Sequence, residues 1–362
     1  MYNPTYHNRA IEEAKKLKKE LDYQKSGKEL YQNNPTFLQF ADDIIGSNSS
    51  VKIDRLKEFY DQIIKDDGEL LMVDDKTKQI YVKLLNFKVS QKGIDRLKEI
   101  GGSVQYIRGN NEKQSKLVNM DYFSVRIDEM PTFGYQTADA GMLFKKIRDN
   151  FLTLSKGSTV FESKCKPHIT MKGYWEFKPY PKNSKEELNR WEKQLGNTLI
   201  KIDAKSEIVT SVITISPPKI IDPADYGAVL ESEISQNAWI FSTIFTPESD
   251  TQPFSGHRQF GIHQDEEGNY RFFTRAIDRI WPSSFISTTN GKECSVENYL
   301  IIADATWNNL IKNVSEFIKK NDGKTTIMKP ETNRIDFNNF FSKFRSEKPV
   351  NFVGNINQSK II

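Results

Sequence analysis

The chain has 362 residues, of which 37% are hydrophobic, 28% charged and 12% aromatic. This aromatic content excludes a disordered chain, and the length allows one large core or two ordinary ones. The net charge is only +4, from 52 basic and 48 acidic residues, so the overall charge gives no support to nucleic-acid binding. Abundant Lys, Asn and Ile point to an AT-rich bacterial genome.

The cysteines and the hydropathy pattern limit where the protein acts. Cys165 and Cys294 lie far apart and form no CxxC pair, so we expect neither a disulfide framework nor a cysteine-based zinc site. The first residues contain no apolar segment typical of a secretory signal, and nowhere do about 18 apolar residues follow one another. We therefore expect a protein without a membrane span, located in the cytoplasm or exported by an apparatus that needs no signal peptide.

The first half of the chain predicts helices mixed with short strands. Apolar residues recur at helical spacing in several segments, while others are rich in strand-forming residues. The expected helices cover 7–32, 37–45, 53–64, 94–100 and 142–154, and the expected strands cover 69–73, 79–89, 104–107 and 122–127. The first helix has a thin apolar stripe, typical of a helix on the surface of the body or on a partner. Gly101-Gly102 provides a natural end for the short helix before it.

The second half predicts an antiparallel sheet followed by a long helix. Its strand candidates are rich in Val, Ile, Thr and aromatic residues. They cover 169–177, 207–216, 239–246, 258–263, 270–275 and 325–328, with helices over 185–199, 303–320 and 337–344. In the helix over 303–320 we expect one apolar side to pack on the sheet. That side consists of Trp307, Leu310, Ile311, Val314 and Ile318.

These elements predict an α+β fold in four parts. We expect an N-terminal helical segment over 1–48, a small α+β region over 49–157, an antiparallel sheet and helix domain over 158–350, and a tail over 351–362. No period of 20–50 residues repeats, which excludes a solenoid. In this fold class, a helical and mixed N-terminal region precedes a C-terminal antiparallel sheet that packs on a long helix.

The most polar candidate site lies in the segment from Pro253 to Trp281. Two β-rich runs flank the connector Gln-Asp-Glu-Glu-Gly-Asn, a pattern typical of a hairpin with a longer loop. The candidate ligand-binding residues of this hairpin are His257, Arg258, His263, Arg271, Arg275 and Arg279. Strand alternation gives each run a more polar side, and these sides can coincide.

Two interpretations of this hairpin remain open. Arginine forks suit phosphate or carboxylate, so at least two guanidinium groups can converge with His257 or His263, as proton donor, on one small ligand. Alternatively, the hairpin is a solvated face with cross-strand ion pairs, in which Arg275 or Arg279 contacts Asp278 or an acid of the turn, Asp265 or Glu266.

Three other patterns are weaker. His257 and His263 with the two acids of the turn lack the rigid set of three or four ligands that zinc requires. Cys165 and His168 are three residues apart beside a proline, which fits a buried thiol better than a catalytic pair. Ser255 has no Gly-x-Ser-x-Gly motif around it, and no phosphate-binding loop occurs. We therefore expect neither a metal nor a cofactor.

The run from Trp239 to Arg279 resembles the end of sheet domains in the START/polyketide-cyclase superfamily. In one branch of that superfamily a strand, the phrase HPxSGxxxF, a hairpin and a final strand of aromatic-polar alternation follow in that order. The matching residues are Trp239, Phe241, Thr243, Pro253, Ser255, Gly256, Phe260, Gly268, Phe272 and Arg279. The motif SGxRxFG…FFTRxxDR also resembles motifs in uncharacterised bacterial proteins whose genes lie near genes of secreted effectors. The resemblance covers about 80 of the 362 residues and contains no catalytic motif.

The resemblance implies a helix-grip architecture, in which a curved antiparallel sheet wraps a C-terminal helix. The aromatic stripe with Trp239 and Phe241 is most simply part of a core. In a helix-grip fold the same side chains line a cavity for apolar ligands, so we count both as candidate ligand-binding residues.

Two functions follow as hypotheses. The first is a non-enzymatic protein that binds an apolar or amphipathic ligand or a protein partner, and that a secretion apparatus can carry as cargo. The alternative is an enzymatic toxin or effector, paired with an immunity protein, that acts on a phosphodiester or a nucleotide through the Arg/His hairpin.

Overall fold

The computed structural model describes residues 75–107, 117–164, 170–181, 184–210, 225–248, 253–265, 267–280 and 292–336. Nearly all of them belong to one unit, Tyr81–Thr332, and a second unit contains Met1–Ile80 and Asn333–Val350. The elements predicted over 7–32, 37–45, 53–64, 69–73 and 337–344, and the tail over 351–362, lie outside the described residues.

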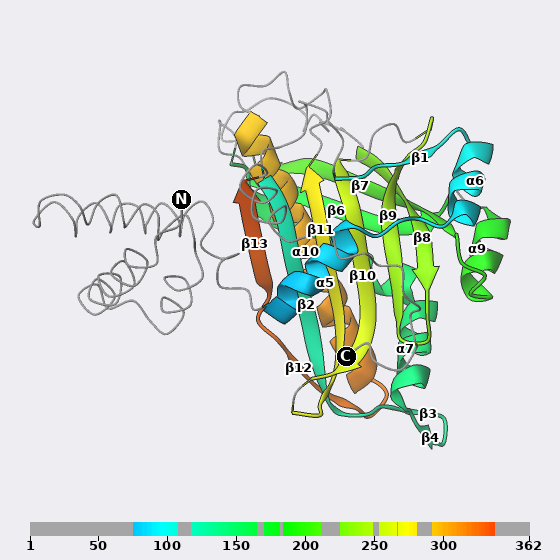
Figure 1. Ribbon diagram of the computed structural model, residues 1–362. Helices are drawn as coiled ribbons and strands as arrows, with labels where there is room; N and C mark the ends of the chain where they lie inside the picture. Colours follow the sequence, from blue (N-terminus) through cyan, green and yellow to red (C-terminus); the bar gives the residue numbers. More distant parts are fainter. Residues whose placement is uncertain are drawn as a thin grey trace, which may run out of the picture. The chain divides into compact units, whose positions relative to one another are not determined.

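One mostly antiparallel sheet of eleven strands dominates the described part of the chain (Figure 1). Along its main path the order is β12-β2-β11-β10-β9-β8-β7-β6-β5, while β1 pairs with β9 and β13 with β2. The strands are β1 Ser103–Val104, β2 Leu117–Glu129, β5 Gly157–Glu162, β6 Thr170–Pro179, β7 Leu199–Thr210, β8 Asp225–Ile234, β9 Ala238–Phe245, β10 Phe254–Gln264, β11 Tyr270–Ile280, β12 Lys324–Ile327 and β13 Glu331–Asp336. A separate ladder pairs β3 Thr132–Phe133 with β4 Gln136–Thr137.

Helices pack on both faces of this sheet. The described helices are α5 Asp75–Leu85, α6 Gln91–Glu99, α7 Ala140–Asp149, α8 Phe151–Leu154, α9 Lys185–Glu192 and α10 Lys292–Lys319. On one face, α7, α8 and α10 contribute to the largest hydrophobic core, together with strand residues such as Trp239. We call this the α10 face. On the opposite face α6 packs Leu97 against Leu199 and Leu230, and the Tyr81 hydroxyl of α5 donates a hydrogen bond to the Asp121 carbonyl, 3.0 Å away.

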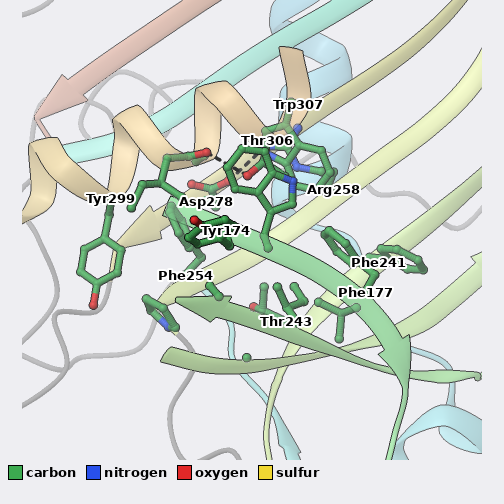
Figure 2. A pocket seen from close by; sticks show the side chains of 18 of the residues that line it. Tyr174, Phe177, Phe241, Thr243, Phe254, Arg258, Asp278, Tyr299, Thr306 and Trp307 are labelled. Carbon is green, nitrogen blue, oxygen red and sulfur yellow. Dashed lines mark hydrogen bonds and ion pairs between the residues drawn. The ribbon is translucent and has the colours of Figure 1, made fainter. Parts of the chain in front are cut away.

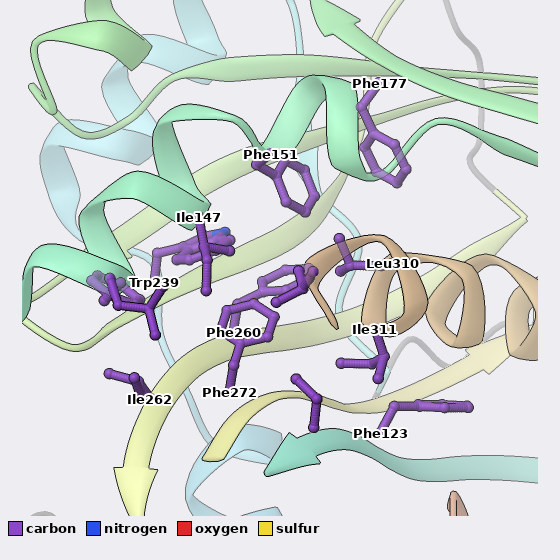
Figure 3. Packing of buried hydrophobic residues seen from close by; sticks show 14 of the residues in the cluster. Phe123, Ile147, Phe151, Phe177, Trp239, Phe260, Ile262, Phe272, Leu310 and Ile311 are labelled. Atoms are coloured by element: carbon purple, nitrogen blue, oxygen red, sulfur yellow. The ribbon is translucent and has the colours of Figure 1, made fainter. Parts of the chain in front are cut away.

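The core on the α10 face is built largely from aromatic rings (Figure 3). Trp239 and Phe260 stack with their centroids 4.8 Å apart, and Phe151 contacts both rings edge-on. Leu310 and Ile311 of α10 cover the same cluster. Each such side chain stabilises the fold by about 1.5–3 kcal/mol when it is fully buried. The core is therefore dense where α7, α8 and the second half of α10 meet the sheet.

Several predicted elements are confirmed. The hairpin predicted over 258–275 is formed by β10 and β11, and α6 ends before Gly101, whose φ of 67° is the left-handed conformation that glycine adopts easily. The apolar side of the last long helix does pack on the sheet core, with Trp307 partly buried there. Its fully buried members are Leu310, Ile311, Val314 and Ile318.

Other predicted elements are wrong. Residues 79–85 are helical in α5 rather than a strand. The helix expected over 185–199 ends at Glu192, because Gln194, Gly196 and Asn197 have positive φ values and turn the chain into β7. The sequence pattern missed β8, where the register shifts between Glu231 and Glu233 and interrupts the alternation.

The expected fold class is also wrong. The described residues form mainly one antiparallel sheet with few helices, not a helical and mixed region followed by a helix-grip domain. β2 lies between β11 and β12, so strands from both halves of the chain share the sheet. α10 contains 28 residues, and this long helix does not have the arrangement expected of the C-terminal helix in a helix-grip fold. Local patterns revealed strands correctly but could not reveal which distant strand each one pairs with.

Candidate functional site

The sheet divides the predicted hairpin site between its two faces. The register pairs Arg258 with Phe241 on β9 and with Ala276 on β11, whereas His257 pairs with Ser242 and Ile277. Because side chains alternate along a strand, Arg258 shares the α10 face with Trp239 and Phe241. The opposite face carries His257, His263, Arg271, Arg275 and Arg279.

A cavity of about 140 Å³ lies between the sheet and α10 (Figure 2). Its location follows from the strand pairing: in the described residues β7 pairs with β8 only from Leu199 to Ala204, and its second half pairs with β6 alone. Most lining side chains are apolar or aromatic and come from six strands and the helix. The aromatic ones are Tyr174, Trp175, Phe177, Phe241, Phe254, Tyr299 and Trp307.

Arg258 forms the charged end of this cavity. Its two terminal nitrogens donate to the two carboxylate oxygens of Asp121, at 2.8 and 2.6 Å, and its guanidinium lies 4.0 Å from the centroid of the Trp307 ring. The carboxylate of Asp278 lies 3.7 Å from the same guanidinium. The Asn119 amide donates to both carboxylates, at 2.9 and 3.3 Å. A buried cation that is hydrogen-bonded in this way is fixed in position.

Backbone geometry aligns this cluster. Gly256 has a φ of 145°, and a Cβ atom there would collide with the carbonyl oxygen of Ile277. Only glycine allows this close approach of β10 to β11 next to Asp278. Thr243, whose side chain also lines the cavity, accepts a hydrogen bond from the Gly256 amide at 2.9 Å.

The ring of His257 is buried on the opposite face, although the residue also contributes to the cavity lining. The residue is 2% exposed, and its ring lies edge-on to Phe87 and Tyr106. Nδ1 is hydrogen-bonded to the Ser242 hydroxyl at 2.8 Å, and Nε2 has no hydrogen-bond partner among the described residues. Burial lowers the pKa of His257 to about 4, so its ring is neutral at pH 7.

The other hairpin residues of the opposite face are more accessible. Arg271 donates from Nε to Asp265 at 2.7 Å, and Arg275 donates from Nε to the Gln259 side-chain oxygen at 2.8 Å. His263 forms hydrogen bonds to the Tyr122 hydroxyl and to a backbone carbonyl. Burial, together with the two nearby guanidinium groups, lowers the pKa of His263. Arg279, on the same face, is the exception, since it is only 8% exposed and pairs in register with Ser255.

Sequence reasoning missed the contribution of β2. Asp121 and Asn119 organise the cavity end, and Tyr122 contacts His263, yet the sequence pattern indicated none of them. The signal that could have found them was polar residues inside a long apolar run, since buried polar groups require partners. Within the described hairpin, Arg258 forms ion pairs with Asp121 and Asp278, and Arg271 forms one with Asp265. Glu266, Cys165 and His168 lie outside the described residues.

Comparison with known proteins assigns no function to this site. No protein-family model matches the sequence, and no curated protein matches it either. The resemblance to the START/polyketide-cyclase superfamily therefore stays a prediction. Among the described residues, no group of three or more His, Cys, Asp or Glu side chains is placed to hold a metal ion. None of the described helices is long and apolar enough to cross a membrane.

Proposed function

We propose that this protein binds a small apolar or amphipathic molecule in the cavity between the sheet and α10. The observation that supports this proposal is the cavity itself, with a volume of about 140 Å³ and a largely apolar lining that includes seven aromatic side chains. Apolar cavities of about 150 Å³ stay dry and take up molecules such as benzene, because filling them restores lost dispersion contacts. A ligand with a short apolar body fits this volume.

The polar groups of the cavity favour an amphipathic ligand. Arg258, Asp278 and Thr243 contribute to its lining, while Phe177 and Phe241 lie together elsewhere along it (Figure 2). A few fixed polar groups in an otherwise apolar pocket orient a ligand and provide its specificity. The polar end of the ligand is therefore expected at the Arg258 cluster and its apolar part against the two phenylalanines.

The enzymatic alternative gains no specific observation in its favour. It requires a histidine next to several arginines that hold a substrate. Arg258 lies on the α10 face, and His257 is buried and neutral on the opposite face. Of the original set, only His263 with Arg271 and Arg275 lies together on an accessible surface, and no described residue there is placed as a nucleophile.

The test is binding of an n-alcohol series from butanol to decanol, measured by tryptophan fluorescence and by the melting temperature. Trp175 and Trp307 line the cavity and report its occupation. The parent chain should bind saturably, with an optimum at one chain length. The Ala303→Phe variant places a ring into the cavity from α10, and this variant should lose binding. Its control, Asn308→Phe, adds the same ring at an exposed position of the same helix and should bind like the parent.

Two results would overturn the proposal. One is the absence of saturable binding to the parent chain over the whole alcohol series. The other is equal binding by the Ala303→Phe and Asn308→Phe variants, which would place the bound alcohol elsewhere. Both variants must melt cooperatively, so that a loss of binding reports a filled cavity and not an unfolded chain.

A further inference from the structure

Arg275 is a half-buried cation on the opposite face of the sheet. Its Nε donates to Gln259, and its guanidinium lies 4.5 Å from the centroid of the Phe273 ring. Among the described residues no carboxylate lies within ion-pair distance of it, whereas Arg258 has two and Arg271 has one. Burial lowers the pKa of Arg275, which reflects the cost of removing this charge from water.

A cation held in this way destabilises the fold. Burying a charge without a partner of opposite charge costs free energy, and a neutral amide offsets only part of that cost. Among the described residues only Gln259 hydrogen-bonds the guanidinium, at Nε, which leaves the two terminal nitrogens of Arg275 as a fork. A guanidinium fork of this kind matches two oxygens of a phosphate or carboxylate group.

The side chains around Arg275 form a small platform. Phe273 lies across Gly261, where a Cβ atom would come within 2.9 Å of the ring. Tyr122 stacks on Phe273 with centroids 5.8 Å apart, and His263 meets the same ring edge-on at 5.2 Å. Tyr122 is also the cross-strand neighbour of Arg275. A donor fork, a phenol and an imidazole are thus held around one aromatic ring.

We propose that this platform binds a phosphate-type oxyanion, with the terminal nitrogens of Arg275 on two of its oxygens and the Tyr122 hydroxyl on a third. Arg271 lies across the strand pair from His263 and adds a second positive charge to the site. Charge-assisted hydrogen bonds of this kind are short and strong. The proposal does not depend on the cavity, which lies on the other face of the sheet.

The hydrogen bonds of His263 couple this site to protonation. Nδ1 lies 2.9 Å from the Gln264 carbonyl, which can only accept, so Nδ1 carries a proton. In neutral His263, Nε2 is then an acceptor, and the Tyr122 hydroxyl, 3.2 Å away, donates to it. Protonation of Nε2 reverses this bond and frees the Tyr122 hydroxyl to donate to the anion. Binding should therefore strengthen as the pH falls through the pKa of His263.

Other charged and titratable groups face this site from every neighbouring strand and helix. Tyr81 of α5 and Glu331 of β13 interact electrostatically with Tyr122 or Arg275. Asp265, after β10, interacts with His263 and holds Arg271. Arg126 of β2 lies opposite Arg271 and is paired with Asp128. Hydrogen bonds lower the pKa of Asp128 and of Asp265, and burial raises the pKa of Tyr81 and of Tyr122, so these groups keep their charge state as the pH falls from about 7 and His263 is the group that gains a proton.

The experiment is calorimetric titration of the full chain with inorganic phosphate at constant ionic strength. The parent should bind saturably, and Arg275→Gln should weaken binding by at least about tenfold. Arg126→Gln removes the same charge from the same face and should change the affinity by less than about twofold. An alkyl phosphate and a nucleoside monophosphate, titrated in parallel, distinguish a free anion from a phosphate group on a larger molecule.

The pH series uses sulfate, which does not titrate in this range. As the pH falls from about 7 through and below the ordinary histidine value of about 6.5, the parent should bind sulfate more tightly, and Tyr122→Phe should show a smaller increase than the parent. Absence of saturable phosphate binding to the parent, or equal losses in Arg275→Gln and Arg126→Gln, would overturn the site. If Arg275→Gln does not fold, the sulfate titration of Tyr122→Phe tests the site instead. A pH dependence of sulfate binding equal to that of the parent would then reject the proposal.

Discussion

Two arginines, Arg258 and Arg275, lie on opposite faces of the same hairpin and have opposite environments. Arg258 is almost fully buried, yet both terminal nitrogens contact Asp121, and a tryptophan ring covers the guanidinium. Arg275 is less buried but has a glutamine in place of a carboxylate. Burial alone therefore does not determine whether a cation supports the fold. The presence of a carboxylate partner determines this, and a buried cation without such a partner is the better candidate for binding an external anion.

The largest effect is expected from Arg258→Met. This substitution leaves the carboxylates of Asp121 and Asp278 close together in the core without their cation. Breaking a buried pair in this way costs about 3–5 kcal/mol of unfolding free energy. Urea denaturation of the variant and the parent, monitored by far-UV circular dichroism, measures this loss. A loss below about 1 kcal/mol would mean that the cluster is no more important to the fold than a surface ion pair.

Gly256→Ala tests the backbone approach that aligns the same cluster. The new Cβ would meet the β11 backbone, and the φ of 145° is unfavourable for alanine, so we expect a loss of about 3 kcal/mol or more. Gly268→Ala is the matched control, since its φ is also positive, at 83°, but no atom lies within 4 Å of the added Cβ. The control should lose only about 1 kcal/mol. Equal losses would show that strain in φ, and not the close approach, determines the effect.

The pH dependence of stability tests the buried histidine of the opposite face. The pKa of His257 is about 4 in the folded chain, below the ordinary histidine value of 6.5 that applies to the unfolded chain, so the unfolded chain takes up the proton first as the pH falls. Stability should therefore decrease between about pH 6.5 and about pH 4, by on the order of 3 kcal/mol in total. His257→Phe should lack this component. Subtracting the two profiles, each from urea denaturation, removes the contributions of carboxylates, and parallel profiles would contradict the prediction.

The smallest effect is expected from Arg275→Gln. Removing a cation that has no carboxylate partner among the described residues should leave the unfolding free energy within about 0.5 kcal/mol of the parent, or raise it. The same urea denaturation that measures Arg258→Met measures this value. A loss of unfolding free energy comparable to that of Arg258→Met would show that Arg275 stabilises the fold as Arg258 does.

The comparison also explains what the sequence could and could not predict. Alternation predicted a more polar side for each strand of the hairpin, and the register places His257 and His263 on one side of β10 and Phe260 and Ile262 on the other, which follows from strand geometry alone. It could not predict the partner of Arg258. Asp121 lies on β2, far away in the sequence, and reaches Arg258 only because β2 pairs with β11.

Helix and strand boundaries show the same limit. The apolar stripe of α10 was recognisable because four turns of helical spacing occur within one continuous segment. Residues 79–85 contain apolar residues that fit a strand as well as a helix, and packing of Tyr81, Leu84 and Leu85 decides for the helix. The cavity was expected only through the helix-grip resemblance. Its actual position depends on where β7 leaves β8, a register property that no local pattern contains.

The position of β2 has a consequence for synthesis on the ribosome. β2 pairs with β11, so Ile127 cannot form its strand pairing until Tyr270, about 140 residues later in the chain, has been synthesised. At about 5–20 residues per second this delay is roughly 7–30 s. During that time the nascent chain carries a long strand with apolar side chains on both sides, among them Val118, Met120, Phe123 and Val125. Exposed apolar strands of this kind favour aggregation, so we expect slower translation between β2 and β11 to lower the yield of folded protein.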